Sequence, residues 1–190
     1  MEYYKEFLKW PLVILPGGGL LLGAFYLYEN YGPGAVVKNE NGIPIDFTSN
    51  ATRSLRARNP LSISTSALTA KYGSVSEDNT MGDHLAIFPD TQSGLSASAQ
   101  ELCYSQNYFG GGNNTPQGIG DTWAGPSSTD YGVSIASNMG YQPDAVLNFA
   151  VDGIALMKAM AREENGLPAV ISIPDSMYQA AVSNALNNRR

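Results

Sequence analysis

Apolar and polar positions divide the chain into three stretches with different patterns. Residues 10–28 (WPLVILPGGGLLLGAFYLY) carry no charged side chain. Residues 30–52 are rich in Gly, Asn and Pro and show no helical period, which is typical of a linker. From about residue 53, apolar side chains recur every three to four positions, the spacing of amphipathic helices. We therefore predict an N-terminal membrane anchor (1–30), a linker (31–52) and a mainly α-helical domain (53–190).

The apolar stretch has the length of a transmembrane helix. At ~1.5 Å per helical residue, residues 10–28 nearly match a hydrocarbon core of ~30 Å. Lys5 and Lys9 precede the stretch, whereas the next Lys or Arg is Lys38, and this bias favours a cytoplasmic N-terminus. Residues that are poor in helix interiors interrupt it: Pro11, Pro16 and Gly17–Gly19. Bilayer helices tolerate such residues; the alternative is a kinked core helix or a segment that docks into another protein.

Capping residues and stop signals place the helices of the domain. Thr91 precedes apolar positions at helical spacing, and Thr115 followed by Pro116 is a strong helix start. The other expected helices run from Ser128 or Thr129 to Gly140, from about Asp144 to Glu164 with a break near Asp152-Gly153, and from Pro174-Asp175 onward. A hairpin or loop is expected within Glu77–Phe88. The predicted fold class is mainly α with a small β or loop element, preceded by a transmembrane helix.

Composition excludes several functional classes. Asp plus Glu (17) exceed Lys plus Arg (11), giving a net charge of −6. We expect no nucleic-acid partner, because such affinity comes largely from Lys and Arg that neutralise phosphates. One cysteine and one histidine exclude an internal disulfide framework and a Cys/His zinc cluster. We expect no metal and no cofactor, so carboxylates are the candidate catalytic groups.

A short motif after the linker resembles the opening of a phage protein family. Residues 56–63 read RARNPLSI. Arg56, Asn59, Pro60 and Ile63 match R-N-N-N-P-G-N-I, which opens a family of bacteriophage lysozyme-like virion proteins and lytic transglycosylases. The other four positions depart from the pattern: Ala57, Arg58, Leu61 and Ser62. An active site built from this motif would therefore be impaired.

Later landmarks of this family follow in the same order, so the resemblance covers roughly residues 53–167. They are Ala86-Ile87-Phe88, Gly94-Leu95-Ser96-Ala97, Trp123-Ala124-Gly125-Pro126, Tyr131 with Ile135 and Gly140, and Met157–Gly166, which is similar to the family's closing helix ending in Glu-Asn-Gly. The resemblance implies a lysozyme-like helical domain that acts on peptidoglycan. In the family this helix comes last in the domain. To equate its glutamate, Glu164, with the catalytic glutamate of lysozyme-like enzymes is therefore an additional assumption.

Cleavage of a β-1,4 glycosidic bond needs a general acid with a raised pKa. Glu164 is the first candidate, because it ends a helix, where the negative end of the dipole disfavours ionisation. In lysozyme-like transglycosylases the catalytic glutamate similarly ends a helix before a Ser/Asn-Gly turn. Glu101 is the alternative acid, and Asp121 or Asp130 would be a second carboxylate. The competing interpretation is that Glu163 and Glu164 are solvated acids of a last helical turn.

Aromatic and amide side chains in the middle of the domain suit sugar binding. Tyr and Trp rings stack on the apolar faces of pyranose rings, and amides hydrogen-bond N-acetyl groups. The predicted substrate-binding residues are Asn59, Tyr108, Trp123 and Tyr131. Core packing is the competing interpretation for Trp123 and Tyr131, which stand at helix-face positions.

These features predict a membrane-anchored, virion-associated enzyme that cleaves peptidoglycan, a lytic transglycosylase or a muramidase. It would open the bacterial wall when the phage genome enters or the cell is lysed. Its expected partners are peptidoglycan glycan strands, a lipid bilayer through residues 10–28 and other virion proteins. The expected location is an internal membrane of the virion or the bacterial inner membrane, with a periplasmic C-terminal domain. The alternatives are an inactive lysozyme-like structural protein that links membrane and capsid, or a tethered host protein that binds glycan without cleaving it.

Overall fold

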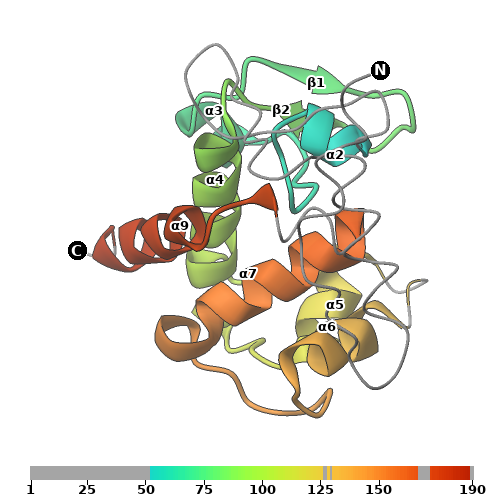
Figure 1. Ribbon diagram of the computed structural model, residues 1–190, viewed down its shortest axis with the longest axis vertical. Coiled ribbons are helices and arrows are strands. Elements are labelled where there is room, and N and C mark those ends of the chain that lie inside the picture. The colour runs from blue at the N-terminus through green and yellow to red at the C-terminus, as the bar shows by residue number, and fades with distance from the viewer. Residues whose placement is uncertain (1–51, 126–127, 129, 167–171, 189–190) are drawn as a thin grey trace, which may run out of the picture. The chain divides into compact units, whose positions relative to one another are not determined.

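The computed structural model describes residues 52–125, 128, 130–166 and 172–188. Helix α4 (Thr91–Tyr104) runs through the middle of this part of the chain (Figure 1). Helix α9 (Asp175–Asn187) packs along α4, and α7 (Phe149–Asn165) packs against both. Helices α5 (Pro116–Trp123) and α6 (Tyr131–Met139) pair with each other, and α6 also contacts α7. All described residues belong to one compact unit.

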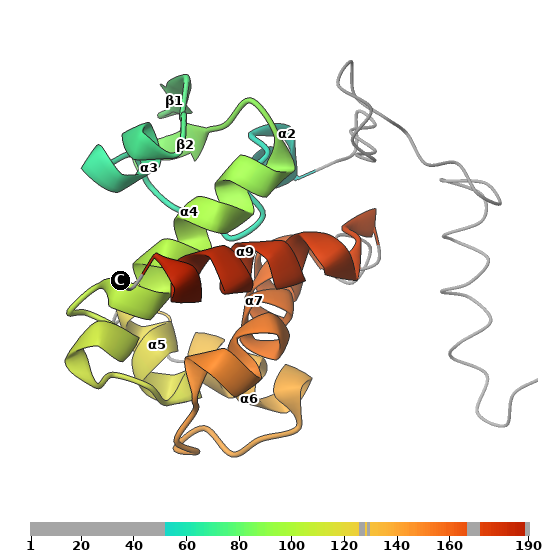
Figure 2. The same cartoon turned by 90° about the vertical axis from the view of Figure 1, so that its left-hand side faces the viewer.

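A small β region lies near the N-terminal end of α4, on the opposite side from α5 and α6 (Figures 1 and 2). It contains α2 (Arg53–Arg56), α3 (Ala67–Lys71) and the antiparallel strands β1 (Ser76–Asp78) and β2 (Leu85–Ile87). The strands lie within the range predicted to hold a hairpin or loop. Arg53 joins α2 to this hairpin, because its Nη1 lies 2.7 Å from Asp83 Oδ2.

Local capping explains where the long helices begin. The Asp90 side chain accepts from the Ser93 N–H at 2.7 Å and caps α4, one residue before the predicted Thr91. Thr115 caps α5 with Pro116 at its first position, as the sequence predicts. Helix α7 begins only after its Asn148 cap, because residues 144–148 form a loop, and it runs unbroken through Asp152.

The core between α4, α5, α6, α7 and α9 is apolar and dry. Its largest fully buried side chains come from every one of these helices: Leu95, Leu102, Ile119, Ile135, Leu156, Met157, Met160 and Tyr178. Burying a side chain of this size contributes ~1.5–3 kcal/mol relative to leaving it exposed. This core holds α4 and α7 in a fixed relation, so the ends of both helices are rigidly placed.

The prediction of a transmembrane helix is wrong for the fold that the structure describes. None of the helices in the described ranges combines the length and the apolar composition that crossing a bilayer requires. The fold class that the structure gives is mainly helical with a two-stranded sheet, and the described residues include no helix that could span a membrane. The same finding contradicts the predicted membrane-anchored location. The segment predicted to be the anchor, residues 10–28, lies outside the described residues, as does the linker up to residue 51.

Helices α5 and α6 cross where each carries a glycine. A Cβ on Gly120 would lie 2.4 Å from the backbone nitrogen of Gly132, and a Cβ on Gly132 would lie 2.6 Å from the Cα of Gln117. The close approach places Trp123, at the end of α5, and Tyr131, at the start of α6, on adjoining segments. These glycines therefore set the position of two predicted substrate-binding residues.

We predict that Gly120→Ala destabilises the protein. Overpacking costs about 1–3 kcal/mol, and here the obstructing atoms are helix backbone, which cannot rotate away. Because alanine regains up to ~1 kcal/mol of helix propensity, the expected net loss is about 1–2 kcal/mol in the free energy of unfolding, measured by urea denaturation. Ser137→Ala on the exposed face of α6 is the control and should stay within ~0.5 kcal/mol. Equal stability of the two variants would contradict the close crossing.

Candidate functional site: a cleft beside a buried glutamate

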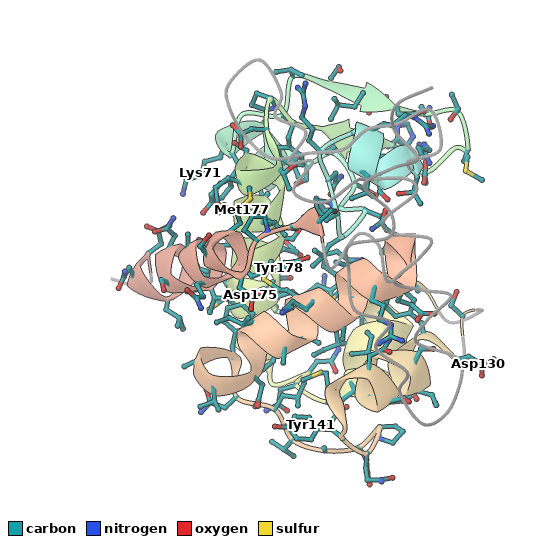
Figure 3. All side chains as sticks on the ribbon, viewed as in Figure 1. Lys71, Asp130, Tyr141, Asp175, Met177 and Tyr178 are labelled. Atoms are coloured by element: carbon teal, nitrogen blue, oxygen red, sulfur yellow. The ribbon has the colours of Figure 1, made fainter. Side chains whose placement is uncertain are left out.

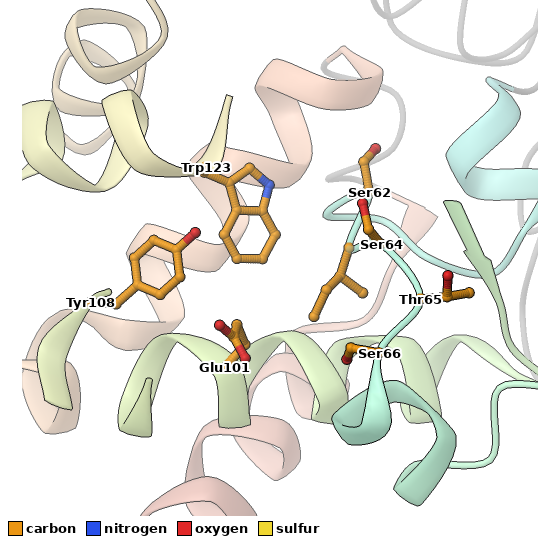
Figure 4. A pocket seen from close by; sticks show the side chains of 8 residues that line it. Ser62, Ser64, Thr65, Ser66, Glu101, Tyr108 and Trp123 are labelled. Carbon is orange, nitrogen blue, oxygen red and sulfur yellow. The ribbon is translucent and has the colours of Figure 1, made fainter. Parts of the chain in front are cut away.

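A cleft of about 250 Å³ opens between the β region and the helices (Figure 4). One wall is the segment 62–66, which follows α2. The other walls are Glu101 from the last turn of α4, Tyr108 from the following loop and Trp123 from the end of α5. Ligand pockets mostly measure ~300–1,000 Å³, so this cleft is slightly smaller than most of them.

Asn59 shapes the wall and is not available to a sugar. Its side chain is fully buried, and its Nδ2 donates to the carbonyls of Ile63 at 2.7 Å and Ala86 at 2.9 Å. Its Oδ1 accepts from the Ile63 N–H at 3.0 Å. The amide thus closes the 59–63 turn and fastens it to β2. The structure gives Asn59 a scaffolding role in place of the predicted substrate contact.

The departures from the family motif fall on positions with special backbone conformations. Arg58 and Ser62 both have left-handed φ angles, 57° and 58°, which asparagine adopts more readily than either residue. The pattern carries asparagine at both positions. Leu61 has no such requirement and is fully buried in the core. These substitutions therefore change backbone strain and packing, and they remove no catalytic carboxyl.

Asn165 fixes the end of α7 against the same turn. Its Nδ2 donates to the carbonyl of Pro60 at 2.7 Å and to that of Ala161 at 3.1 Å. Its Oδ1 accepts from the hydroxyls of Thr52 and Ser54 in α2 and its cap. Gly166 then ends the helix at a φ of 80°, a left-handed value that favours glycine. The Glu-Asn-Gly sequence is thus an anchored helix terminus.

Glu164 lies in this terminus and is largely withdrawn from water. The Tyr131 hydroxyl donates to its Oε1 at 2.7 Å, and the Ser62 side chain also hydrogen-bonds to it. Burial raises the pKa of Glu164 above the ordinary value of a glutamate, and the nearby Glu163 charge adds to this, while the two hydroxyl donors act in the opposite direction. Burial and Glu164 together raise the pKa of Tyr131 well above its usual range, so Tyr131 keeps its proton and remains a donor.

Ser62 connects the buried acid to the cleft. It lines the cleft and also hydrogen-bonds to Glu164. Glu164 therefore stands one side chain behind the cleft wall. Glu163 is the solvated acid of the last turn, whereas Glu164 is half-buried. That Glu164 acts as the acid stays a prediction.

Two aromatic rings form one side of the cleft. Tyr108 is 6% exposed, and its ring centroid lies 5.6 Å from that of Trp123. The Trp123 Nε1–H donates to the Leu61 carbonyl at 2.9 Å, which fixes the indole against the opposite wall. Burial, with a smaller contribution from Glu101, raises the pKa of Tyr108. The rings are rigid, with part of their faces available to a ligand.

The structure brings most, but not all, of the predicted residues together. Glu101, Tyr108 and Trp123 share the cleft, and Glu164 and Tyr131 form a hydrogen-bonded pair behind Ser62. Asp121 is exposed and accepts from Gln117 at 2.7 Å, and Asp130 lies at the edge of the molecule (Figure 3). Neither aspartate lines this cleft.

The hydroxyl-rich wall was not predicted as part of the site. Residues 62–66 read SISTS, and four of their side chains bring hydroxyls to or near the cleft. The sequence signal for this wall is a run of small hydroxyl residues without periodicity. Such runs are also common in ordinary loops, so the pattern does not indicate a site by itself. Only the fold shows that this one faces Glu101 and Trp123.

The described residues hold no cluster that would bind a metal. No group of three or more His, Cys, Asp or Glu side chains comes together in the described ranges. His84 is exposed and lies 3.2 Å from Glu77, and Cys103 is buried in the core. The chemistry available to the cleft is therefore that of carboxyls, hydroxyls and aromatic rings.

No protein-family model matches this chain, and no curated protein matches it either. What the cleft can do is consequently argued from its own residues.

We predict that Glu164→Gln changes how stability depends on pH. The folded protein holds the Glu164 proton to a higher pH than the unfolded chain, whose ordinary glutamate pKa is 4.5. The stability from this bound proton is complete below that value and is lost as pH rises through the folded pKa. Relative to wild type, the variant should gain Tm as the pH rises from about 4.5 through the folded pKa of Glu164, because the neutral amide never ionises.

The quantity to compare is the difference in Tm between wild type and Glu164→Gln at each pH. Arg53 lowers the pKa values of Asp78 and Asp83, and these acids make both proteins more stable as the pH rises. Their effect cancels in the difference. Glu163→Gln, at the exposed neighbour, should follow wild type closely. Parallel curves for wild type and Glu164→Gln would show that the carboxyl is not held protonated by burial.

Proposed function

We propose that this protein cleaves the glycan strands of peptidoglycan, with Glu164 as the general acid. The observation that carries the proposal is a buried carboxyl, oriented by two hydroxyls, immediately behind an aromatic-walled cleft. The resemblance of residues 53–167 to phage lysozyme-like proteins names the substrate class. In that setting the enzyme is a virion protein that opens the wall when the genome enters or the cell is lysed.

The environment of Glu164 suits proton donation to a glycosidic oxygen. A general acid must keep its proton near the working pH and give it up as the C1–O4 bond breaks. Burial supplies the first property, because it disfavours the ionised form. The donors Tyr131 and Ser62 supply the second, because they stabilise the carboxylate that forms.

The same contacts orient the acid. Tyr131 occupies Oε1 of Glu164, which leaves the other oxygen to carry the proton. Asn165 holds the helix end that carries the carboxyl, and Ser62 fixes its direction from the cleft wall. Positioning by neighbours of this kind is a large part of catalytic efficiency.

The walls of the cleft suit an N-acetylated sugar. Trp123 is half-buried and offers part of a flat apolar face to the axial C–H groups of a pyranose ring. Tyr108 is 6% exposed and mainly supports the indole from behind. Ser64 Oγ already donates to the Asp83 carbonyl. Thr65 Oγ1 donates to the Glu77 carboxylate, so both hydroxyls can only accept hydrogen bonds from a sugar in the cleft. The combination of apolar faces with a few polar groups is typical of specific small-ligand sites.

The inactive-scaffold alternative takes its support from the altered motif at residues 56–63. The left-handed backbone at Arg58 and Ser62 makes two of these alterations unfavourable for folding, and Leu61 is buried in the core. None of them removes a carboxyl. The carboxyl, its two donors and the aromatic wall are all in place. We therefore favour the enzyme over the scaffold.

We predict that the full chain clears a peptidoglycan zymogram and that Glu164→Gln abolishes clearing. General acid catalysis contributes ~10²–10⁴-fold, so the initial rate on purified sacculi should fall at least about 100-fold. Glutamine preserves the shape and still accepts from Tyr131, so the circular dichroism spectrum should not change.

Glu163→Gln is the matched control. It removes one carboxylate from the adjacent position, which is exposed, and should retain activity within a few-fold. Loss of activity in both variants, or the absence of clearing by well-folded wild type, would overturn the proposed function.

A further inference from the structure

A second carboxylate faces the cleft from the side opposite Ser62. Figure 4 shows Glu101 rising from α4, with Ser62 and Ser64 on the facing segment and Trp123 between them. Glu164 lies next to Ser62 and outside the cleft lining, so Glu101 is the carboxyl that faces the cleft directly. Glu101 thus belongs to the cleft, but not to the Tyr131–Glu164 pair.

The carboxylate of Glu101 is uncommitted to the fold. Among the described residues, no hydrogen bond or ion pair engages it, although the side chain is half-buried in the cleft. Its nearest electrostatic partner is Tyr108, which stays a neutral hydroxyl. A half-buried acid without a structural partner has its lone pairs free for a water molecule.

We propose that Glu101 is a second catalytic carboxylate, the base that activates a water molecule, so that cleavage of the glycan is hydrolytic. This inference rests on the proposed function of Glu164. It goes beyond it because a single acid is sufficient for the non-hydrolytic reaction, in which the C6 hydroxyl of the sugar closes an anhydro ring.

The step balances with water as the co-reactant. Glu164 gives its proton to the glycosidic oxygen as the C1–O4 bond breaks. A water oxygen forms the new bond to C1, and its proton passes to the Glu101 carboxylate. The products are a free 4-hydroxyl and a new reducing end, and exchange with solvent returns the proton from Glu101 to Glu164.

In an inverting hydrolase the acid and the base act from opposite faces of the sugar. Water must attack from the face opposite the leaving oxygen, so the base and the acid stand on opposite sides of the sugar, ~6.5–9.5 Å apart, with a water between them. The cleft of about 250 Å³ between Glu101 and Ser62 is the space where the water and the sugar meet. Asp121 and Asp130, the other carboxylates considered, lie outside it.

The test is product analysis with the full chain and purified sacculi in heavy-oxygen water. Hydrolysis places one heavy oxygen at each new reducing end, whereas anhydro ends carry none and are lighter by one water. Wild type should give labelled reducing ends. Glu101→Gln should lower their formation about 100-fold or more, with an unchanged melting curve.

A chemical rescue separates a base from a structural role. In Glu101→Ala the cleft gains room, and azide, which needs no base, replaces the activated water. The expected product is a glycosyl azide, formed only in the presence of Glu164. A variant damaged merely in its folding would not be rescued.

The outcomes distinguish the two proposals. Labelled reducing ends that depend on Glu101, with azide rescue, support the inference. Anhydro ends from wild type, or full hydrolytic activity in Glu101→Gln, overturn it and leave the acid role of Glu164 standing. No cleavage by folded wild type overturns both.

Discussion

The candidate site depends on the side-chain amide of Asn165. This single group joins three segments that are far apart in the sequence: the start of α2, the 59–63 turn and the end of α7. Each such bond contributes only ~1 kcal/mol net, but leaving a buried amide unpaired costs ~1–3 kcal/mol. The contact therefore acts mainly by excluding other arrangements of these segments. Because Glu164 precedes Asn165 and Ser62 follows the turn, fixing the amide also fixes the acid against the cleft wall.

Burial of Glu164 opposes the stability of the fold. A carboxyl with a raised pKa disfavours folding once the pH exceeds the pKa of the unfolded chain, and a neutral side chain of the same shape would avoid that cost. Elsewhere in the described ranges most of the largest buried side chains are apolar and Arg53 is paired with acids, but the buried hydroxyls of Thr91 and Tyr178 lack a hydrogen-bond partner. Local conflicts of this kind concentrate at functional sites, where chemistry outweighs stability.

The sequence is sufficient to predict the helices and part of the site. Thr115-Pro116, Gly140 and Asn165-Gly166 are local signals, and the structure places helix ends at each of them. The start of α7 was misplaced because the loop before Asn148 carries apolar residues, Val146 and Leu147, that continue an apparent helical pattern. The cleft itself has no local signal. Its walls come from residues 62–66, 101, 108 and 123, which only tertiary packing brings together, and the scaffolding role of Asn59 depends on Ala86, 27 positions away.

The two carboxyls of the candidate site differ in their surroundings, and the roles proposed for them follow from this difference. Burial raises the pKa of Glu164 and its hydroxyl neighbours lower it, so its protonated form is favoured relative to an exposed glutamate while its carboxylate is still stabilised. Burial alone would keep the proton too tightly for transfer, and donors alone would remove it before substrate binds. Glu101 has neither constraint among the described residues, and its carboxylate opens on the cleft. Pairs of acids whose environments separate their protonation states are the general means by which one site supplies both an acid and a base.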